Sequence, residues 1–349
     1  MRKIYKDWKQ ILWGRNPPIK RVKNLKNGIK YCQATNYRHD SLLTGEFGTR
    51  SGLYSWINVF RGDVFLFKEI KDKLNDFDII QVNLSGQDWH LVNNIRELIG
   101  KDSSTKIVAN CDYVTELWQN SFDYLDTMRR ELTGADMLFG TEPYMCGALA
   151  ELTGRKVFEI PHPTHVKRLK SLTKRESNDY LSVNWHRYDN FTMIPSLAAR
   201  NHGLKTQLIG YEVGSDKRRW TTSPLYDRII GSTNFLDFCE TLMESKLVYE
   251  PFTLNSYGRT TVETAALGIP TVGSDRVASI RQCFPKTMCN PYDVQKSREL
   301  IEKVIKDEKF RDEVVEYANN AVEHYNFENS SARYLAALSE CEKKHDYKL

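Results

Sequence analysis

The most constraining stretch of the sequence is residues 246–274, where short apolar runs flank a helical pattern between two glycines. The apolar run 247–249 predicts a strand. A polar loop leads to Gly258, a helix follows, and Gly268 with Pro270 ends that helix before a second strand. The N-terminus of such a helix presents N–H groups without intrahelical partners to an anion. The stretch therefore predicts a βαβ unit with an anion site at the helix mouth.

Similar alternation extends over most of the chain, which at 349 residues is long for one hydrophobic core. Strands separated by helical stretches favour a parallel sheet with helices on both faces. We therefore expect an α/β fold with two Rossmann-like domains. The other expected strands are 29–34, 76–84, 106–112, 135–140, 157–160, 180–185, 205–210 and 228–231. The expected helices include 53–60, 90–99, 120–132, 191–202, 234–245 and a long amphipathic tail, 293–345, interrupted near 324–327.

A proline-marked segment separates the two series of strands. Pro161 and Pro163 precede a charged run, which is typical of a domain boundary. We expect a basic N-terminal segment (1–28), a first domain (29–165), a linker (166–179) and a second domain (180–325).

Composition narrows the class of protein. The chain is 40% hydrophobic and 27% charged, which is typical of globular proteins, and it has no run of about 18 apolar residues that would span a membrane. Its seven cysteines are scattered and never spaced C-x-x-C. This pattern favours reduced thiols in the cytoplasm over a disulfide framework or a zinc site, so we expect no metal.

Positive charge is concentrated at the N-terminus. Residues 1–30 carry a net charge of +9, whereas the rest of the chain carries −4. Together with Trp8 and Trp13, this charge suits a polyanionic partner such as DNA or an anionic membrane surface. A solvated basic segment without a partner is the alternative. The candidate contact residues are Lys3, Lys6, Lys9, Arg15, Lys20 and Arg21.

Polar residues follow several expected strands, at the sheet edge where α/β proteins place functional side chains. Asn83, Asn110 and Asp112 are of this kind, and each could equally cap a turn. The loop after the first strand holds Gly48 and Gly52, whose small size would let the backbone approach a phosphate or a sugar. An ordinary surface loop explains these glycines as well.

The motif around Glu263 resembles one in GT-B glycosyltransferases, and most closely in those of the retaining family-4 type. In that family a loop like Y-E-G-F-G leads into a helix ending in G-x-P-V-V. Here Ser256-Tyr257-Gly258 is followed by Glu263 and then by Gly268-Ile269-Pro270. The segment 325–327 resembles the family's closing segment, which implies that 326–349 is a helix returning to the first domain.

The resemblance implies a nucleotide-sugar donor, most simply a UDP-sugar, in a cleft between the domains, with no obligatory cofactor or metal. Glu263 would bind the ribose hydroxyls, and Gly258, Arg259 and Thr260 would hold the diphosphate, with Tyr257 in the same loop. Arg187, Lys217 and Arg218 would neutralise the leaving group, and Gly231, Ser232 and Thr233 would contact the base. Asp112 is the best match for a catalytic residue near the acceptor, and His90 is a poorer one.

One position departs from the family pattern. The family has a glutamate eight residues before Glu263, where this chain has Asn255. An amide can hydrogen-bond a sugar but cannot carry charge, and Glu250 is a conceivable substitute. Asn255 is therefore the expected sugar contact of a glycosyltransferase, while a sugar-nucleotide-binding protein without turnover remains open. Another GT-B activity, such as a sugar-nucleotide epimerase, remains open on the fold alone.

Overall fold

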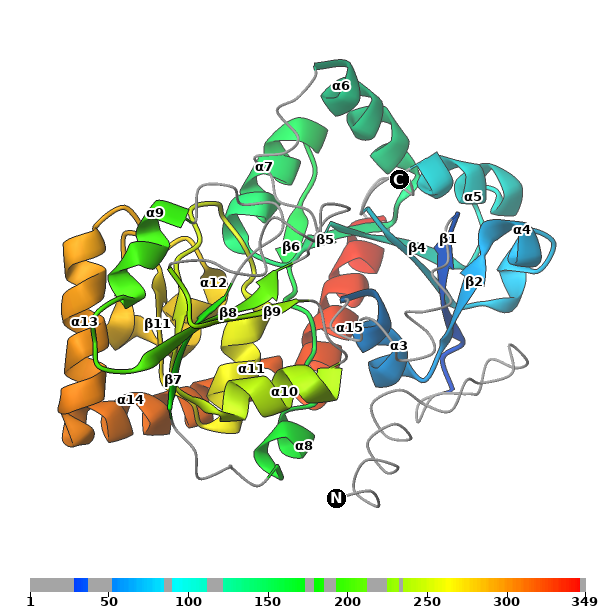
Figure 1. Ribbon diagram of the computed structural model, residues 1–349. Helices are drawn as coiled ribbons and strands as arrows, with labels where there is room; N and C mark the ends of the chain where they lie inside the picture. Colours follow the sequence, from blue (N-terminus) through cyan, green and yellow to red (C-terminus); the bar gives the residue numbers. More distant parts are fainter. Residues whose placement is uncertain are drawn as a thin grey trace. The chain divides into compact units, whose positions relative to one another are not determined.

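The computed structural model describes residues 28–36, 52–84, 90–111, 122–172, 179–184, 193–211, 225–231 and 235–345. These residues form two compact units (Figure 1). The first unit takes the described residues up to 163 and those from 327 onward, and the second unit takes 164–326. Each unit holds one six-stranded parallel sheet, which confirms the expected α/β fold with two Rossmann-like domains.

The sheet of the first unit has the strand order β2-β1-β3-β4-β5-β6. The order reverses between β1 and β3, and this reversal is the switch point of the sheet. The strands are β1 (Tyr31–Thr35), β2 (Asp63–Leu66), β3 (Ile79–Asn83), β4 (Lys106–Cys111), β5 (Met137–Gly140) and β6 (Val157–Glu159).

Helices cover both faces of this sheet, so β1, β3 and β5 are buried along their whole length. One face packs against α4 to α7 and the other against α3 and α15. The helices are α3 (Gly52–Phe60), α4 (Phe67–Ile70), α5 (Leu91–Ile99), α6 (Phe122–Glu131), α7 (Pro143–Thr153) and α15 (Phe327–His345), with short 3₁₀ turns at Leu74–Asp76 and Leu132–Gly134.

The last helix, α15, completes the core of the first unit. Its Tyr334 is fully buried and packs against Trp56, Phe60 and Phe139, with ring centroids 5.0, 4.9 and 5.6 Å away. Rings at these distances stabilise a core beyond their buried area. Two ion pairs add to this attachment, from Lys156 to Glu340 at 2.6 Å and from Lys106 to Glu342 at 3.7 Å.

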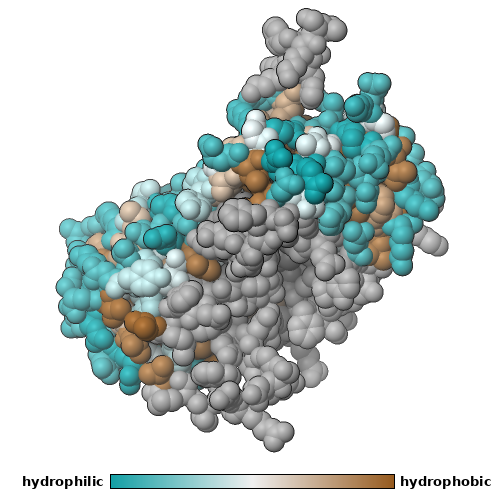
Figure 2. All heavy atoms as spheres, turned by 90° about the horizontal axis from the view of Figure 1, so that it is seen from above, coloured by the Kyte–Doolittle hydropathy of each residue, from teal (hydrophilic) through white to brown (hydrophobic). Residues whose placement is uncertain are grey.

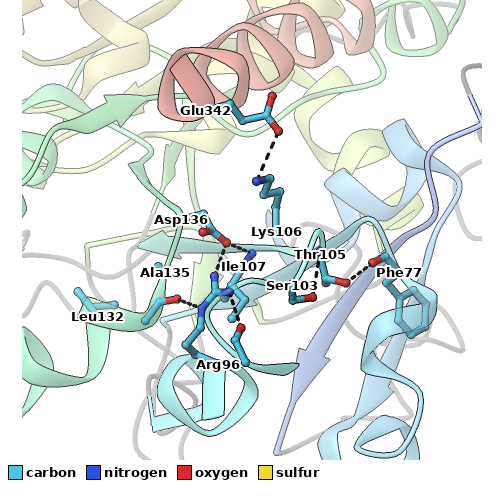
Figure 3. A network of polar contacts seen from close by, with 12 residues as sticks. Phe77, Arg96, Ser103, Thr105, Lys106, Ile107, Leu132, Ala135, Asp136 and Glu342 are labelled. Atoms are coloured by element: carbon cyan, nitrogen blue, oxygen red, sulfur yellow. Dashed lines mark hydrogen bonds and ion pairs between the residues drawn. The ribbon is translucent and has the colours of Figure 1, made fainter. Parts of the chain in front are cut away.

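Figure 3 shows the second of these pairs beside a polar network at the start of β4. Asp136, just before β5, accepts hydrogen bonds from the backbone N–H of Ile107 at 2.7 Å and from Arg96 of α5 at 2.5 Å (Figure 3). Charge-assisted bonds of this kind are about twice as strong as neutral ones. The network therefore fixes α5 and β5 to β4 at the edge opposite the carboxyl ends of the strands.

The sheet of the second unit has the order β12-β11-β10-β7-β8-β9, and its switch point lies between β7 and β10. The strands are β7 (Tyr180–Asn184), β8 (Lys205–Tyr211), β9 (Arg228–Gly231), β10 (Ser245–Glu250), β11 (Thr271–Ser274) and β12 (Met288–Cys289). The helices are α8 (Val166–Lys170), α9 (Met193–Ser196), α10 (Phe235–Met243), α11 (Arg259–Leu267), α12 (Ala278–Cys283), α13 (Val294–Lys306) and α14 (Glu308–Ala321). Short 3₁₀ helices span Leu197–Ala199, Pro285–Thr287 and Val322–Tyr325.

Several elements differ from the sequence expectation. The expected helix 191–202 is described only as α9 and a 3₁₀ turn, which ends where Arg200 takes an extended backbone, with φ −85° and ψ 152°. The tail breaks twice, since Asp307 ends α13 and caps α14 through Phe310 N at 3.0 Å. Helix α8 lies within the segment expected to be a linker, and β2, β12, α7 and α12 were not foreseen.

The described surface is mostly hydrophilic on the face shown in Figure 2, with small apolar areas separated by polar ones. The large apolar side chains that the structure shows exposed are Leu98, Tyr144, Ile194, Met288, Tyr292 and Tyr317. Within the described residues, none of the helices combines the length and the apolar character needed to cross a membrane.

Candidate functional site

The mouth of α11 follows the carboxyl end of β10, beside the switch point of the second unit. Gly258 caps the helix with a left-handed backbone, at φ 77°. A Cβ at this position would lie 2.0 Å from Val277 Cγ1 and 2.5 Å from Ser279 Oγ. Both the backbone conformation and the lack of space therefore require glycine here.

The loop before α11 is fixed to the start of α12. Ser256 N donates to Arg276 O at 3.3 Å, Ala278 N donates to Ser256 O at 2.9 Å, and Ser279 N donates to Tyr257 O at 3.1 Å. Ser279 Oγ also donates to Gly258 O at 2.6 Å. Four hydrogen bonds thus hold three consecutive residues, which pre-organises the backbone before any ligand binds.

A buried polar cluster joins β7 and β10 to α11. Glu250, at the end of β10, is fully buried and accepts hydrogen bonds from Asn184 Nδ2 at 3.2 Å and from Thr261 Oγ1. Asn184 Nδ2 also donates to Thr260 Oγ1 at 3.0 Å. Because Thr260 and Thr261 belong to the first turn of α11, the cluster fixes the position of the helix mouth on the sheet.

Glu263 lies one turn into α11 and is 1% exposed. Its Oε1 lies 3.7 Å from Arg259 Nε, and the Arg259 side chain is 16% exposed. A buried carboxylate is costly unless it is paired or hydrogen-bonded, so this position needs partners. The pair can offer acceptors for hydroxyl groups and a positive charge for an anion.

The side chain of Tyr257 is buried near Arg259 and Glu263 on one side and Thr164 on another. Burial raises its pKa well above the ordinary value, and the charge of Arg259 and the side chain of Thr164 counter part of that shift. Its phenol therefore stays protonated at neutral pH and acts by packing and hydrogen bonding.

The structure shows why Glu250 is a poor substitute for the family glutamate. Its carboxylate is committed to Asn184 and Thr261 inside the cluster described above. Asn255, the expected sugar contact, lies in the same loop as Tyr257, just before the mouth of α11. Its side chain is nearly buried, at 9% exposed.

The structure brings together the expected donor residues of 255–263. Gly231 ends β9 and Gly52 begins α3. His90 lies at the start of α5, half exposed, with Nδ1 3.6 Å from Glu131. The expected residues that lie outside the described part of the chain are Lys3, Lys6, Lys9, Arg15, Lys20, Arg21, Gly48, Asp112, Arg187, Lys217, Arg218, Ser232 and Thr233.

Sequence reasoning missed Asn184 and Ser279 as parts of this site. Asn184 ends a strand, so its place at a sheet edge was readable, but its bond to Thr260 depends on strand order. Ser279 hydrogen-bonds Gly258 from twenty-one positions further along the chain, and no local sequence pattern predicts such a contact. Among the described residues, no three His, Cys, Asp or Glu side chains come together as a metal site would need.

No protein-family model matches the chain, and no curated protein matches its sequence. Solved structures do match. One is an alpha-glucosyltransferase in complex with UDP-glucose and DNA containing an abasic site, with a TM-score of 0.60 and 14% identity over 89% of this chain and 98% of that chain. Another is Anabaena HepE in complex with UDP-glucose, with a TM-score of 0.68 and 12% identity over 89% and 99%.

A third match is an alpha,alpha-trehalose-phosphate synthase from Burkholderia xenovorans, with a TM-score of 0.59 and 10% identity over 78% and 76% of the two chains. Together with the two parallel sheets, these matches show that the chain has the GT-B fold. The resemblance first noted around Glu263 therefore holds at the level of the whole fold.

Proposed function

We propose that the protein is a retaining glycosyltransferase that moves a sugar from a nucleotide-diphosphate donor, a UDP-sugar, to an acceptor hydroxyl. The observation that carries the proposal is the buried Glu263 behind the glycine-capped mouth of α11, in a GT-B fold. Structures of similar fold were solved with UDP-glucose. In α/β sheets, ligands bind outside the carboxyl ends of strands at the switch point, where this helix mouth lies.

The proposed chemistry follows from these groups. The Glu263 carboxylate accepts hydrogen bonds from the two ribose hydroxyls, and Arg259 adds positive charge beside it. The N–H groups of the first turn of α11, at Gly258, Arg259 and Thr260, bind the diphosphate. Such donors stabilise charge that grows on the leaving diphosphate as the glycosidic bond breaks.

Gly231 at the end of β9 and residues outside the described part of the chain complete the proposed site. We assign Arg187, Lys217 and Arg218 to the leaving diphosphate, Gly231 with Ser232 and Thr233 to the base, and Asp112 to the acceptor. Donor chemistry of this type needs no metal, because these basic residues and the N–H groups of α11 would offset the charge of the leaving diphosphate. The diphosphate itself can take the proton from the acceptor hydroxyl.

Asn255 favours a second candidate, a protein that binds sugar nucleotides without transferring the sugar. An amide at this position hydrogen-bonds a sugar but supplies no charge. Turnover with any donor and acceptor pair would exclude this candidate, and tight donor binding with no turnover or donor hydrolysis would support it.

For the acceptor, we propose DNA, with an anionic membrane surface as the competing source of the same charge. The support is the net charge of +9 in residues 1–30 and the similarity to an alpha-glucosyltransferase solved with DNA. Neutralising Lys3, Lys6, Lys9, Arg15, Lys20 and Arg21 should weaken acceptor use in a salt-dependent way and spare donor binding. The scattered cysteines are consistent with a cytoplasmic site of action.

The donor assignment is tested by calorimetry with UDP and UDP-glucose. Glu263→Ala should raise the donor Kd by roughly 10- to 150-fold, which corresponds to about 1.5–3 kcal/mol for a lost charged hydrogen bond. Glu244→Gln is the matched control, because it breaks the 2.6 Å pair with Arg228 in the same unit at the opposite edge of the sheet. An unchanged Kd in Glu263→Ala would refute the ribose assignment.

A further inference from the structure

The first turn of α7 presents an exposed aromatic ring at the carboxyl edge of the first unit's sheet. Helix α7 begins two residues after Gly140, where β5 ends, and its second residue, Tyr144, is 56% exposed. Pro143 beside it is exposed as well. Ligands of α/β sheets bind outside this edge. Single exposed rings are common on protein surfaces, so the neighbours of Tyr144 decide whether this ring has a ligand.

Gly147, one turn further along α7, is exposed and has an ordinary helical backbone. A Cβ at this position would meet no heavy atom of the described residues within 4 Å, so neither backbone conformation nor packing requires glycine. Glycine in a helix is less stable than alanine. Residues three apart share a helix face, and side chains tilt toward the N-terminus. A side chain at 147 would therefore lie beside Tyr144, and the glycine leaves that space open.

The mouth of α7 is closed to anions by its own carboxylate. Glu142 is fully buried, and its two oxygens accept hydrogen bonds from Tyr144 N at 2.9 Å and from Met145 N at 2.5 Å. A carboxylate here satisfies the free N–H groups and offsets the positive end of the helix dipole. In contrast, Gly258 caps α11 without a side-chain hydrogen bond. The first turn of α7 thus favours a neutral group over a phosphate.

We call the exposed residues Pro143, Tyr144 and Gly147 the α7 platform. We propose that the α7 platform binds the acceptor by stacking an unpaired DNA base on the Tyr144 ring. This inference rests on the proposed function, which names DNA as the acceptor. The basic segment 1–30, with its net charge of +9, would attract the phosphates. The platform would hold a neutral ring, which those charges do not recognise.

The physical basis is a ring held in place before the ligand arrives. Proline at the first helical position has a backbone angle already suited to the helix. The hydrogen bond from Tyr144 N to Glu142 fixes the next residue. Little backbone freedom is therefore lost when a base lies against the ring, and pre-organisation of this kind strengthens binding. Stacking on an aromatic side chain suits any base, because every base has a π-face.

The test measures binding of the full chain to a labelled single-stranded oligothymidylate at low salt, by fluorescence anisotropy. Tyr144→Ala should raise the Kd by roughly 5- to 150-fold, which corresponds to ~1–3 kcal/mol for one stacked base. Tyr144→Phe keeps the ring and should stay within about threefold of the wild type. Because no phosphate contact is lost, the salt dependence of the Kd should be the same in Tyr144→Ala and in the wild type. UDP binding should be unchanged.

Gly147→Ala separates the platform from a merely structural glycine. The added methyl group should raise the melting temperature by about 1–4 °C, because alanine is the better helix former. The same methyl group should weaken oligothymidylate binding, since it fills the space beside Tyr144. Tyr317→Ala is the matched control, because Tyr317 is a 47% exposed tyrosine on α14 in the second unit. It should leave the oligothymidylate Kd unchanged.

The failures are distinguishable. A wild type that binds no oligothymidylate would overturn the DNA acceptor and the platform together, while UDP calorimetry judges the donor site separately. Normal binding with an unchanged Kd in Tyr144→Ala would overturn the platform alone. A Tyr144→Ala protein that keeps the oligothymidylate but loses binding of maltotriose would show that the ring holds a sugar, which overturns the assignment to a base. Unchanged binding in a stabilised Gly147→Ala would overturn the role given to the open space.

Discussion

The switch points of the two sheets are both polar and buried, but they are built from different chemistry. The second unit places a carboxylate there, Glu250, held by Asn184 and by the hydroxyl of Thr261 in α11. Among the described residues, the first unit uses neutral groups there. Its ladder, all on one face of the sheet, consists of Gln33, Tyr31, Gln81, Asn83 and Asn110.

The neutral ladder is joined within the sheet. Tyr31 donates to Gln81 at 2.9 Å, and Gln81 and Asn110 both donate to Asn83 Oδ1, at 3.0 and 2.9 Å. At its ends, Gln33 Oε1 and Asn110 Oδ1 have no hydrogen-bond partner among the described residues. In contrast, the carboxylate cluster reaches out of its sheet into a helix.

A polar switch point is therefore common to both units, and only the second unit combines it with the helix mouth proposed as the nucleotide site. In the second unit the polar group orients a helix whose N–H groups and buried Glu263 can meet a ligand. In the first unit the polar groups mainly satisfy one another. The following predictions test this contrast, from the largest expected effect to the smallest.

Gly258→Ala should have the largest effect. The added methyl group combines a left-handed φ with a clash against Val277, at a cost of roughly 2–5 kcal/mol of unfolding free energy. Donor binding should be lost as well, because the loop must move. Urea denaturation and calorimetry measure the two effects. Gly154→Ala, also left-handed but in open space, is the control and should cost less and spare binding.

Glu250→Ala should come next. It removes the acceptor of the Thr261 hydroxyl and one of the two acceptors of the Asn184 amide, which should cost about 2–4 kcal/mol in all. Because the cluster orients α11, donor affinity should fall together with stability. Glu250→Gln restores an acceptor of the same shape and should recover most of both. Equal losses in the two variants would mean that charge, rather than hydrogen bonding, holds the cluster.

The neutral ladder should respond unevenly. Asn83→Ala removes the acceptor of two buried amides and should cost about 2–4 kcal/mol. Gln33→Met loses one bond but also removes an oxygen that has no partner among the described residues, so its cost should stay below about 1 kcal/mol. Denaturant titration of both variants gives the comparison. Comparable costs would contradict the assignment of Gln33 to the end of the ladder.

The ion pair between Lys170 of α8 and Glu323, 2.7 Å long, should give the smallest effect. The hydrogen bond from Lys170 holds the pKa of Glu323 below its ordinary value. The pair therefore stabilises the fold above the ordinary carboxyl pKa, and this contribution is lost as the pH falls through the lower pKa of the folded state. Since Glu323 is 47% exposed, Lys170→Ala should cost less than about 1 kcal/mol at pH 7.

The measurement is the unfolding free energy of wild type and Lys170→Ala between pH 7 and pH 3. The gap between the two should narrow as the pH falls. Lys286→Ala, which breaks the exposed pair with Glu313, is the matched surface control. If the difference in unfolding free energy between wild type and Lys170→Ala grew as the pH falls, the direction assigned to the Glu323 pKa shift would be wrong.

Much of the fold was readable from the sequence because buried parallel strands are short apolar runs with clear ends. The strand 106–112 and the helix between Gly258 and Gly268 were predicted to within one residue. Strand β2 was missed because its Asp63-Val64-Phe65-Leu66 is short and follows a helix directly. Helix α7 had a readable signal, with Glu142 as its cap and Pro143 in its first turn.

The site was readable only in part. The Gly258 and Glu263 spacing lies within one helix, so a local pattern carries it. The contacts of Glu250 with Asn184 and of Tyr257 with Tyr325 join residues more than sixty positions apart. Such pairs depend on strand order and helix packing, which hydrophobic periodicity does not encode.

Helix α15 has a consequence for the order in which the protein is made. Among the described residues, the second unit is one continuous stretch, 164–326, whereas the first unit lacks Tyr334, the centre of its aromatic core, until residues beyond 326 leave the ribosome. Domains generally fold as units during synthesis. The first unit therefore begins to emerge before the second but completes its core after it. Until α15 has been synthesised, Trp56 and Phe139 lack their contacts with Tyr334.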